Sequence, residues 1–166
     1  MFKIFARLMA VSVSAIALAA AIPITVSAAG GGGGGVPGTI ELTISPDMTV
    51  SDKLILTGTV TVTCPLLIDG MTGLPVASSY PDGALNVSQV SGKSIAHAGL
   101  GGWTTTCDGV PRTFTLTGAA WDRPFKQGAG AAQAFTGQLC GLDPVAGTFA
   151  CASGSATQPV SIKAIH

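Results

Sequence analysis

The chain is poor in charged residues, in aromatic residues and in histidine. Of its 166 residues, 10% are Asp, Glu, Lys or Arg and 5% are aromatic, and the two histidines are His97 and His166. Eight basic residues balance eight acidic ones. Because nucleic-acid binding requires a basic face that neutralises phosphates, we expect no nucleic-acid partner.

Residues suited to catalysis and metal binding are also scarce. The sequence has no Cys-x-x-Cys pair and no Gly-x-Ser-x-Gly motif, which argues against a zinc site and a hydrolase nucleophile elbow. Glu41 is the single glutamate, and most aspartates fall in turns, which disfavours a pair of catalytic carboxylates. We expect no catalytic residue, metal or cofactor. The one hydrolase candidate is His97, with Ser94 or Asp108 as its partner.

The first 28 residues have the features of a cleavable signal peptide. Lys3 and Arg7 form a basic start, residues 8–22 form a largely apolar run, and residues 26–28 offer small side chains for cleavage. A retained membrane anchor is the alternative, because residues 8–26 are almost long enough to span a bilayer. We expect cleavage, no stable membrane insertion afterwards, and a secreted, extracellular or cell-surface location.

Behind the leader, the glycine run at 30–35 predicts a flexible spacer over residues 29–38, because glycine packs no side chain and has high backbone entropy. The folded domain is then expected over residues 39–166. No cysteine directly follows the apolar run, so a lipid anchor on cysteine is not expected.

Within this domain, apolar residues alternate with polar or small ones, which is typical of β-strands. The clearest strand covers residues 54–64, with Leu54, Leu56 and Val60 on one face and threonines on the other; Ile55 is the apolar exception on the outer face. The same alternation predicts strands at 40–44, 85–90, 94–107, 113–118, 131–140, 149–151 and 160–162.

The alanine-rich residues 129–134 would also suit a helix. Flanking glycines and the alternation that leads through Phe135 and Leu139 favour a strand instead. Turns rich in Asp, Gly and Pro separate the strands, and short strands at this spacing indicate a β-sandwich.

All four cysteines, Cys64, Cys107, Cys140 and Cys151, follow the predicted leader, and an even count there indicates two disulfides. Successive antiparallel strands run in opposite directions, which places all four cysteines at one end of the sandwich. Cys140 and Cys151 flank one hairpin loop and are natural partners. We therefore predict the pairs Cys140–Cys151 and Cys64–Cys107.

Several short segments carry a resemblance to known proteins: TVTCP at 61–65, VSQ at 87–89, CDG at 107–109 and FKQG at 125–128. Over about residues 39–163 the chain resembles the immunoglobulin-like sandwiches of small secreted bacterial proteins of unknown function. The resemblance implies an all-β, immunoglobulin-like antiparallel β-sandwich of seven to nine strands with two disulfides. It implies no particular activity, since unrelated functions share this fold.

We expect the disulfide end to carry any binding edge, because strand direction brings most of the turn aspartates there. The candidate residues are Asp69, Tyr80, Asp82, Asp108, Arg112 and Asp143. Oxygen-rich loops of this kind can also bind Ca²⁺, although no calcium-binding motif supports it. The long connection at residues 65–84 is expected at the same end, either as a recognition loop or as an apolar cap over the core.

Residues 121–126 are expected at the opposite end, where Trp121 and Phe125 would either anchor a partner or cover the core. The leading hypothesis is an exported, non-enzymatic monomer whose loops bind a glycan, a protein or a small molecule. The alternatives are an inert structural module of the cell envelope and a small hydrolase that uses His97.

Overall fold

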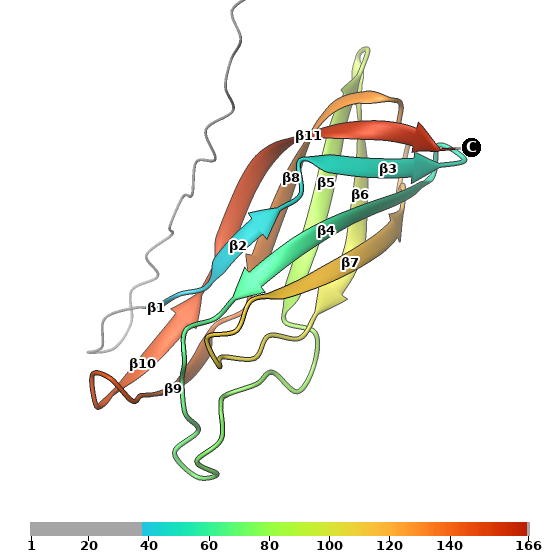
Figure 1. Ribbon diagram of the computed structural model, residues 1–166. Helices are drawn as coiled ribbons and strands as arrows, with labels where there is room; N and C mark the ends of the chain where they lie inside the picture. The colour runs from blue at the N-terminus through green and yellow to red at the C-terminus, as the bar shows by residue number, and fades with distance from the viewer. Residues whose placement is uncertain (1–37, 166) are drawn as a thin grey trace, which may run out of the picture.

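The computed structural model describes residues 38–165, and within them the chain forms eleven β-strands and no helix (Figure 1). The strands are β1 (Gly38–Thr39), β2 (Glu41–Ile44), β3 (Asp47–Ser51), β4 (Ile55–Thr63), β5 (Gly83–Ser91), β6 (Ser94–Trp103), β7 (Arg112–Ala119), β8 (Gly128–Thr136), β9 (Leu139–Asp143), β10 (Thr148–Ser153) and β11 (Ser155–Ile165). The predicted leader and nearly all of the predicted spacer lie outside the described residues. A search of the described residues finds no apolar helix of membrane-spanning length.

Eight strands form one hydrogen-bonded sheet that folds over into two layers. Its order is β2-β4-β3-β11-β8-β5-β6, with β7 on the other edge of β4. In Figure 1, β2, β3, β4 and β7 form one layer, and β11, β8, β5 and β6 form the other. The remaining strands, β1, β10 and β9, form a small sheet at one end. The fold is therefore the all-β sandwich that the sequence predicts.

The chain joins the two layers through β3, which is not among the predicted strands. Residues 41–44 and 49–51 pair along the same edge of β4, and the two segments are separated at Pro46, which has no N–H to donate. Residues 47–51 also pair in parallel with residues 161–165 of β11. Residues 45–47, which the sequence predicts as a turn, thus interrupt the pairing with β4 only briefly. After them the chain continues as β3, which also pairs with β11 of the second layer.

At the other side of the sandwich, β6 and β7 bring the layers together again. Ala98 and Ala120 form an isolated bridge, and the Trp121 N–H donates to the carbonyl oxygen of His97 at 2.9 Å. Threonine pairs strengthen the neighbouring β4–β7 contact: the hydroxyls of Thr61 and Thr113 are 2.8 Å apart. This supports the predicted threonine-rich outer face of β4, since cross-strand hydroxyl pairs stabilise a sheet.

The core combines alanines with large aliphatic side chains. Strands β6 and β8 direct Ala96, Ala98, Ala132 and Ala134 inward. The largest side chains that are fully buried come mostly from other strands; they are Ile40, Ile44, Met48, Leu56, Leu85, Leu100, Phe125 and Ile162. Close packing requires this complementarity, because a void costs the contacts that would have filled it.

Two apolar residues differ from their expected positions. Leu54 precedes β4 and is exposed, because it belongs to the turn that begins at Ser51. Phe135 is also exposed, because Ala132, Ala134 and Thr136 occupy the inner positions of β8, which ends at Thr136 before β9 starts at Leu139. The alternation around residues 131–140 thus spans two strands, and alanines occupy the inner face of the first. Similarly, the strand predicted at 94–107 ends at Trp103.

Phe125 lies outside any strand yet is fully buried, whereas Trp121, four residues earlier, is 69% exposed. Phe125→Ala should therefore lower the free energy of unfolding by about 3–5 kcal/mol through the lost burial and the cavity left behind. Urea unfolding followed by circular dichroism measures this change. Trp121→Ala is the matched control and should change stability by less than about 1 kcal/mol. Equal losses in both variants would contradict this account of the connection between β7 and β8.

Candidate functional site

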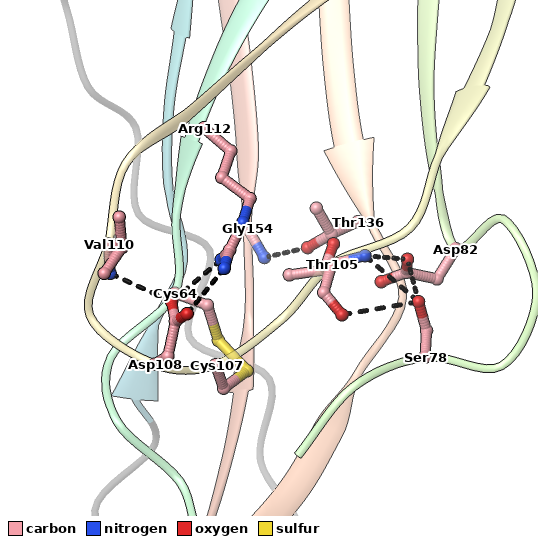
Figure 2. The surroundings of a disulfide bond; sticks show 10 residues. All are labelled: Cys64, Ser78, Asp82, Thr105, Cys107, Asp108, Val110, Arg112, Thr136 and Gly154. Atoms are coloured by element: carbon pink, nitrogen blue, oxygen red, sulfur yellow. Dashed lines mark hydrogen bonds and ion pairs between the residues drawn. A yellow bond between two sulfur atoms is a disulfide. The ribbon is translucent and has the colours of Figure 1, made fainter. Parts of the chain in front are cut away.

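Both disulfides lie at one end of the sandwich and join the predicted pairs. Cys64 bonds to Cys107 with a Cα–Cα distance of 4.5 Å, and Cys140 bonds to Cys151 at 4.0 Å. The first bond links the end of β4 to the segment after β6 (Figure 2), and the second crosses between β9 and β10. Two disulfides are typical of proteins in an oxidising compartment.

The long connection between β4 and β5 is ordered at this end by backbone hydrogen bonds. Leu67 donates to the carbonyl of Cys107 and accepts from Val76, and the Cys107 N–H donates to Val76. Ile68 and Leu142 of β9 exchange two bonds of 2.8 Å each. The connection therefore forms its own small hairpin, which is held between β9 and the disulfide segment. Its apolar Leu67 is buried, while the tip faces solvent.

That tip and the β9–β10 turn share one geometry. In each, an aspartate Oδ1 accepts the N–H groups two and three residues on: Asp69 accepts at 2.9 and 2.8 Å, and Asp143 at 2.8 and 3.1 Å. Each turn closes on a glycine four residues after the aspartate, Gly73 or Gly147, with φ near +68°. Glycine suits both positions because other residues rarely adopt the left-handed region.

A third aspartate caps the turn after the Cys64–Cys107 bond. Asp108 Oδ1 accepts the N–H of Val110 at 3.0 Å, and both carboxylate oxygens pair with the guanidinium of Arg112 (Figure 2). The bonds from Arg112 and Val110 lower the pKa of Asp108 to about 2. The backbone N–H groups of Thr72 and Met71 likewise lower the pKa of Asp69 below its usual value.

Each capped turn exposes an apolar side chain two residues after its aspartate. Met71 is 97% exposed, Val145 is 96% exposed and Val110 is 52% exposed. We call these three side chains the knobs. They come from three separate loops, and backbone bonds and a disulfide connect those loops at their bases. The end of the sandwich is therefore a rigid support for apolar tips.

Every aspartate of the predicted binding edge makes hydrogen bonds within the loops, and a ligand role for these residues stays a prediction. Asp69, Asp108 and Asp143 bond to their own turns, and Asp82 accepts from Ser78 and from the N–H of Thr105 (Figure 2). Carboxylates used in this way stabilise loops. Tyr80 is exposed. Across residues 38–165, no group of three His, Cys, Asp or Glu side chains is arranged to hold a metal ion.

The knobs are not among the residues predicted from the sequence, although a signal was present. The triplets Asp69-Gly70-Met71, Asp108-Gly109-Val110 and Asp143-Pro144-Val145 share one pattern, an aspartate followed by a turn residue and an apolar residue. Asp and Gly or Pro predict the turn by known local chemistry. An apolar residue at the exposed third position has no structural reason, and that conflict marks the knobs.

His97 lies on the outer face of β6 and outside the three capped turns. Its side chain is exposed, and its backbone N–H donates to Asp122 Oδ1 at 3.2 Å. The hydroxyl of Ser94 donates to the carbonyl of Ser91, and Asp108 pairs with Arg112. The expected hydrolase partners of His97 are therefore bonded elsewhere. The hydrolase hypothesis stays a prediction.

Comparison with known proteins gave no relative: no protein family, curated protein or solved structure matches this chain.

The capped turns predict a pH dependence of stability. Asp69 and Asp108 have a lower pKa in the folded state than the ordinary value of 3.8, so the folded state binds fewer protons than the unfolded state as the pH falls. The contribution of Asp108 is present above the ordinary pKa of 3.8 and is lost as the pH falls towards its folded-state pKa of about 2, and the contribution of Asp69 is lost in the same direction. Asp108→Asn should therefore be less stable than the parent at neutral pH, and the difference should shrink on acidification.

Urea midpoints at several pH values test this prediction. Glu41→Gln on β2 is the control, because Glu41 is exposed and has no side-chain bond among the described residues. It should follow the parent at every pH. A stability difference for Asp108→Asn that is constant from neutral to acid pH would contradict the assigned role of the carboxylate.

Proposed function

We propose that this chain is an exported, non-enzymatic interaction module that docks onto a partner protein through the three knobs. The observation that carries the proposal is the near-complete exposure of Met71 and Val145 on turns that aspartates cap. An apolar side chain held in water gains free energy on burial, about 1.5–3 kcal/mol for a Met or Val. Exposed apolar surface marks an interaction site when several side chains act together, so the proposal takes the three knobs as one set.

The rigidity of the knobs favours binding. A flexible loop loses conformational freedom when it docks, and that loss subtracts from affinity. Here the aspartate caps and the Cys64–Cys107 bond fix the loops before the partner arrives. Because the knobs project into solvent from three separate loops, they suit the surface of a macromolecule better than a small molecule.

Export is part of the proposal. The predicted signal peptide, with cleavage after residue 28, and the two disulfides both favour a secreted or surface-associated protein in an oxidising compartment. The resemblance to immunoglobulin-like sandwiches of secreted bacterial proteins fits this location and stays a prediction. We propose that the module acts as a monomer.

The knobs can be tested as a set. The variant Met71→Ser, Val110→Ser, Val145→Ser removes their apolar surface and should leave the fold intact, because all three side chains are exposed. In the expressing host, a photo-crosslinking amino acid at position 145 should give a discrete adduct with one partner. The serine changes at positions 71 and 110 should abolish that adduct, and affinity for the isolated partner should fall by more than about tenfold.

Val90 provides the matched control. It is also apolar, 73% exposed and near a hairpin tip, but it lies at the end opposite the disulfides. A crosslinker at position 90 should give no such adduct, and Val90→Ser should bind the partner as the parent does. Equal crosslinking from positions 90 and 145, or none from either, would reject docking through the knobs.

The two alternatives predict other results. An inert envelope module predicts that scrambling residues 66–80 leaves every phenotype of the host unchanged, whereas the knob proposal predicts loss of the adduct. A hydrolase centred on His97 predicts that activity on an ester or amide panel disappears in His97→Ala. The binding proposal predicts that the His97→Ala variant binds the partner protein as the parent does, because His97 lies on β6 and not on a capped turn.

A further inference from the structure

A second surface lies on the outer face of the layer formed by β11, β8, β5 and β6. It contains a groove of about 530 Å³ that Trp121 bounds on one side. The polar side chains along it are Asn86, Ser88, His97, Gln133 and Thr157. The groove differs in chemistry from the knobs. It offers amides, hydroxyls and an indole ring, whereas the knobs offer aliphatic groups.

The strand register arranges part of this groove as a straight row. Asn86 on β5 is opposite Gln133 on β8, and Gln133 is opposite Thr157 on β11. Residues paired in this way project from the same face of the sheet, and neighbouring strands are about 4.8 Å apart. Hydrogen-bonding side chains therefore recur at regular intervals across three strands.

Trp121 completes the row at its β6 end. Asn86 is paired with Gly99 on β6, and a Cβ on Gly99 would come within 2.7 Å of Trp121 Cζ2. The indole thus lies directly over Gly99, where any larger residue would displace it. Because Trp121 is 69% exposed, most of the ring surface faces solvent beside the Asn86 amide.

Strands β5 and β8 place no formal charge on this face, and the Asp122 carboxylate lies at its β6 edge, where it accepts the N–H of His97 at 3.2 Å. The outward residues of β5 and β8 are Ala84, Asn86, Ser88, Val90, Ala129, Ala131, Gln133 and Phe135. A charged ligand would find no opposite charge among these residues. A neutral ligand rich in hydroxyls would find hydrogen-bond partners there. Amides and hydroxyls can both donate and accept hydrogen bonds, as sugar hydroxyls do. An exposed indole offers a flat apolar face for the C–H side of a sugar ring.

We propose that this face binds a neutral polysaccharide, with a sugar ring stacked on Trp121 and further rings along the row of Asn86, Gln133 and Thr157. The site is separate from the knobs, so the protein would hold a glycan on one face and a partner protein at one end. A peptide is a poorer occupant, because peptides usually add to a free strand edge or insert several apolar anchors. The groove lies on a sheet face and has one large aromatic anchor.

The chain offers a direct optical test, because its two tryptophans differ in exposure. Trp103 is 3% exposed and Trp121 is 69% exposed, so iodide should quench Trp121 selectively. The protein purified from the exported fraction is titrated with β-glucan, galactomannan, dextran and N-acetylglucosamine oligomers as neutral probes, and with polygalacturonate as a charged probe. We expect at least one neutral probe to protect Trp121 from iodide and to slow the protein in a gel that contains the probe.

Variants of the groove identify the site. Trp121→Ala should weaken binding in the gel by about tenfold or more, and Asn86→Ala and Gln133→Ala should each weaken it severalfold. The remaining Trp103 emission reports whether the variant is folded. Phe149→Ala is the matched control, an exposed aromatic residue at the disulfide end, and should bind as the parent does. The triple knob variant should also bind the polysaccharide normally, which separates this proposal from the one above.

Three results would overturn the proposal: no protection of Trp121 by any neutral probe, retention by polygalacturonate alone, or binding that Trp121→Ala leaves unchanged while Trp103 reports a native fold. Retention of a peptide library with the same dependence on Trp121, and of no polysaccharide, would assign the groove to peptides and would equally reject it.

Discussion

The disulfide end depends on one constraint: a backbone N–H or carbonyl that is shielded from water needs a partner, even where the chain leaves its sheets. A connection of this length would ordinarily be mobile. Here Leu67, Ile68 and Val76 use their backbone groups against Cys107 and β9, and aspartates satisfy the turns at the tips. Because backbone groups and carboxylates bond to one another, little polar chemistry is left facing outward. The apolar side chains of the knobs remain exposed at the tips of these bonded turns.

The second face follows from how the core is filled. Ala132 and Ala134 take inner positions of β8, which leaves Phe135 on the outer face, whereas Trp103 at the end of β6 is buried. Trp121 follows β7 and lies over Gly99, and Phe125 is fully buried. The outer side of the layer then combines an indole with small and amide-bearing residues.

Alternation of apolar and polar residues was enough to predict the sandwich, its main strands and the disulfide pairs, because period and strand direction are local properties. Alternation did not predict where the chain passes to another layer or to another sheet. Pro46 and Gly137 mark turns in the sequence, but nothing local shows that β3 crosses to β11 or that β9 leaves β8. The turn aspartates were located correctly, and whether any of them also binds a ligand stays a prediction, since a carboxylate that caps a turn and one that binds a ligand have the same sequence.

The positions of the described chain ends give the molecule a polarity. β1 pairs with Ala152 beside the Cys140–Cys151 bond, so the chain enters the domain at the end that carries the knobs. β11 runs away from this end and reaches Ile165 at the far end (Figure 1). Whatever precedes residue 38 is therefore attached next to the knobs. A tether there would hold them close to its anchor and raise their local concentration for partners on the same surface, while a label after β11 would point away from it.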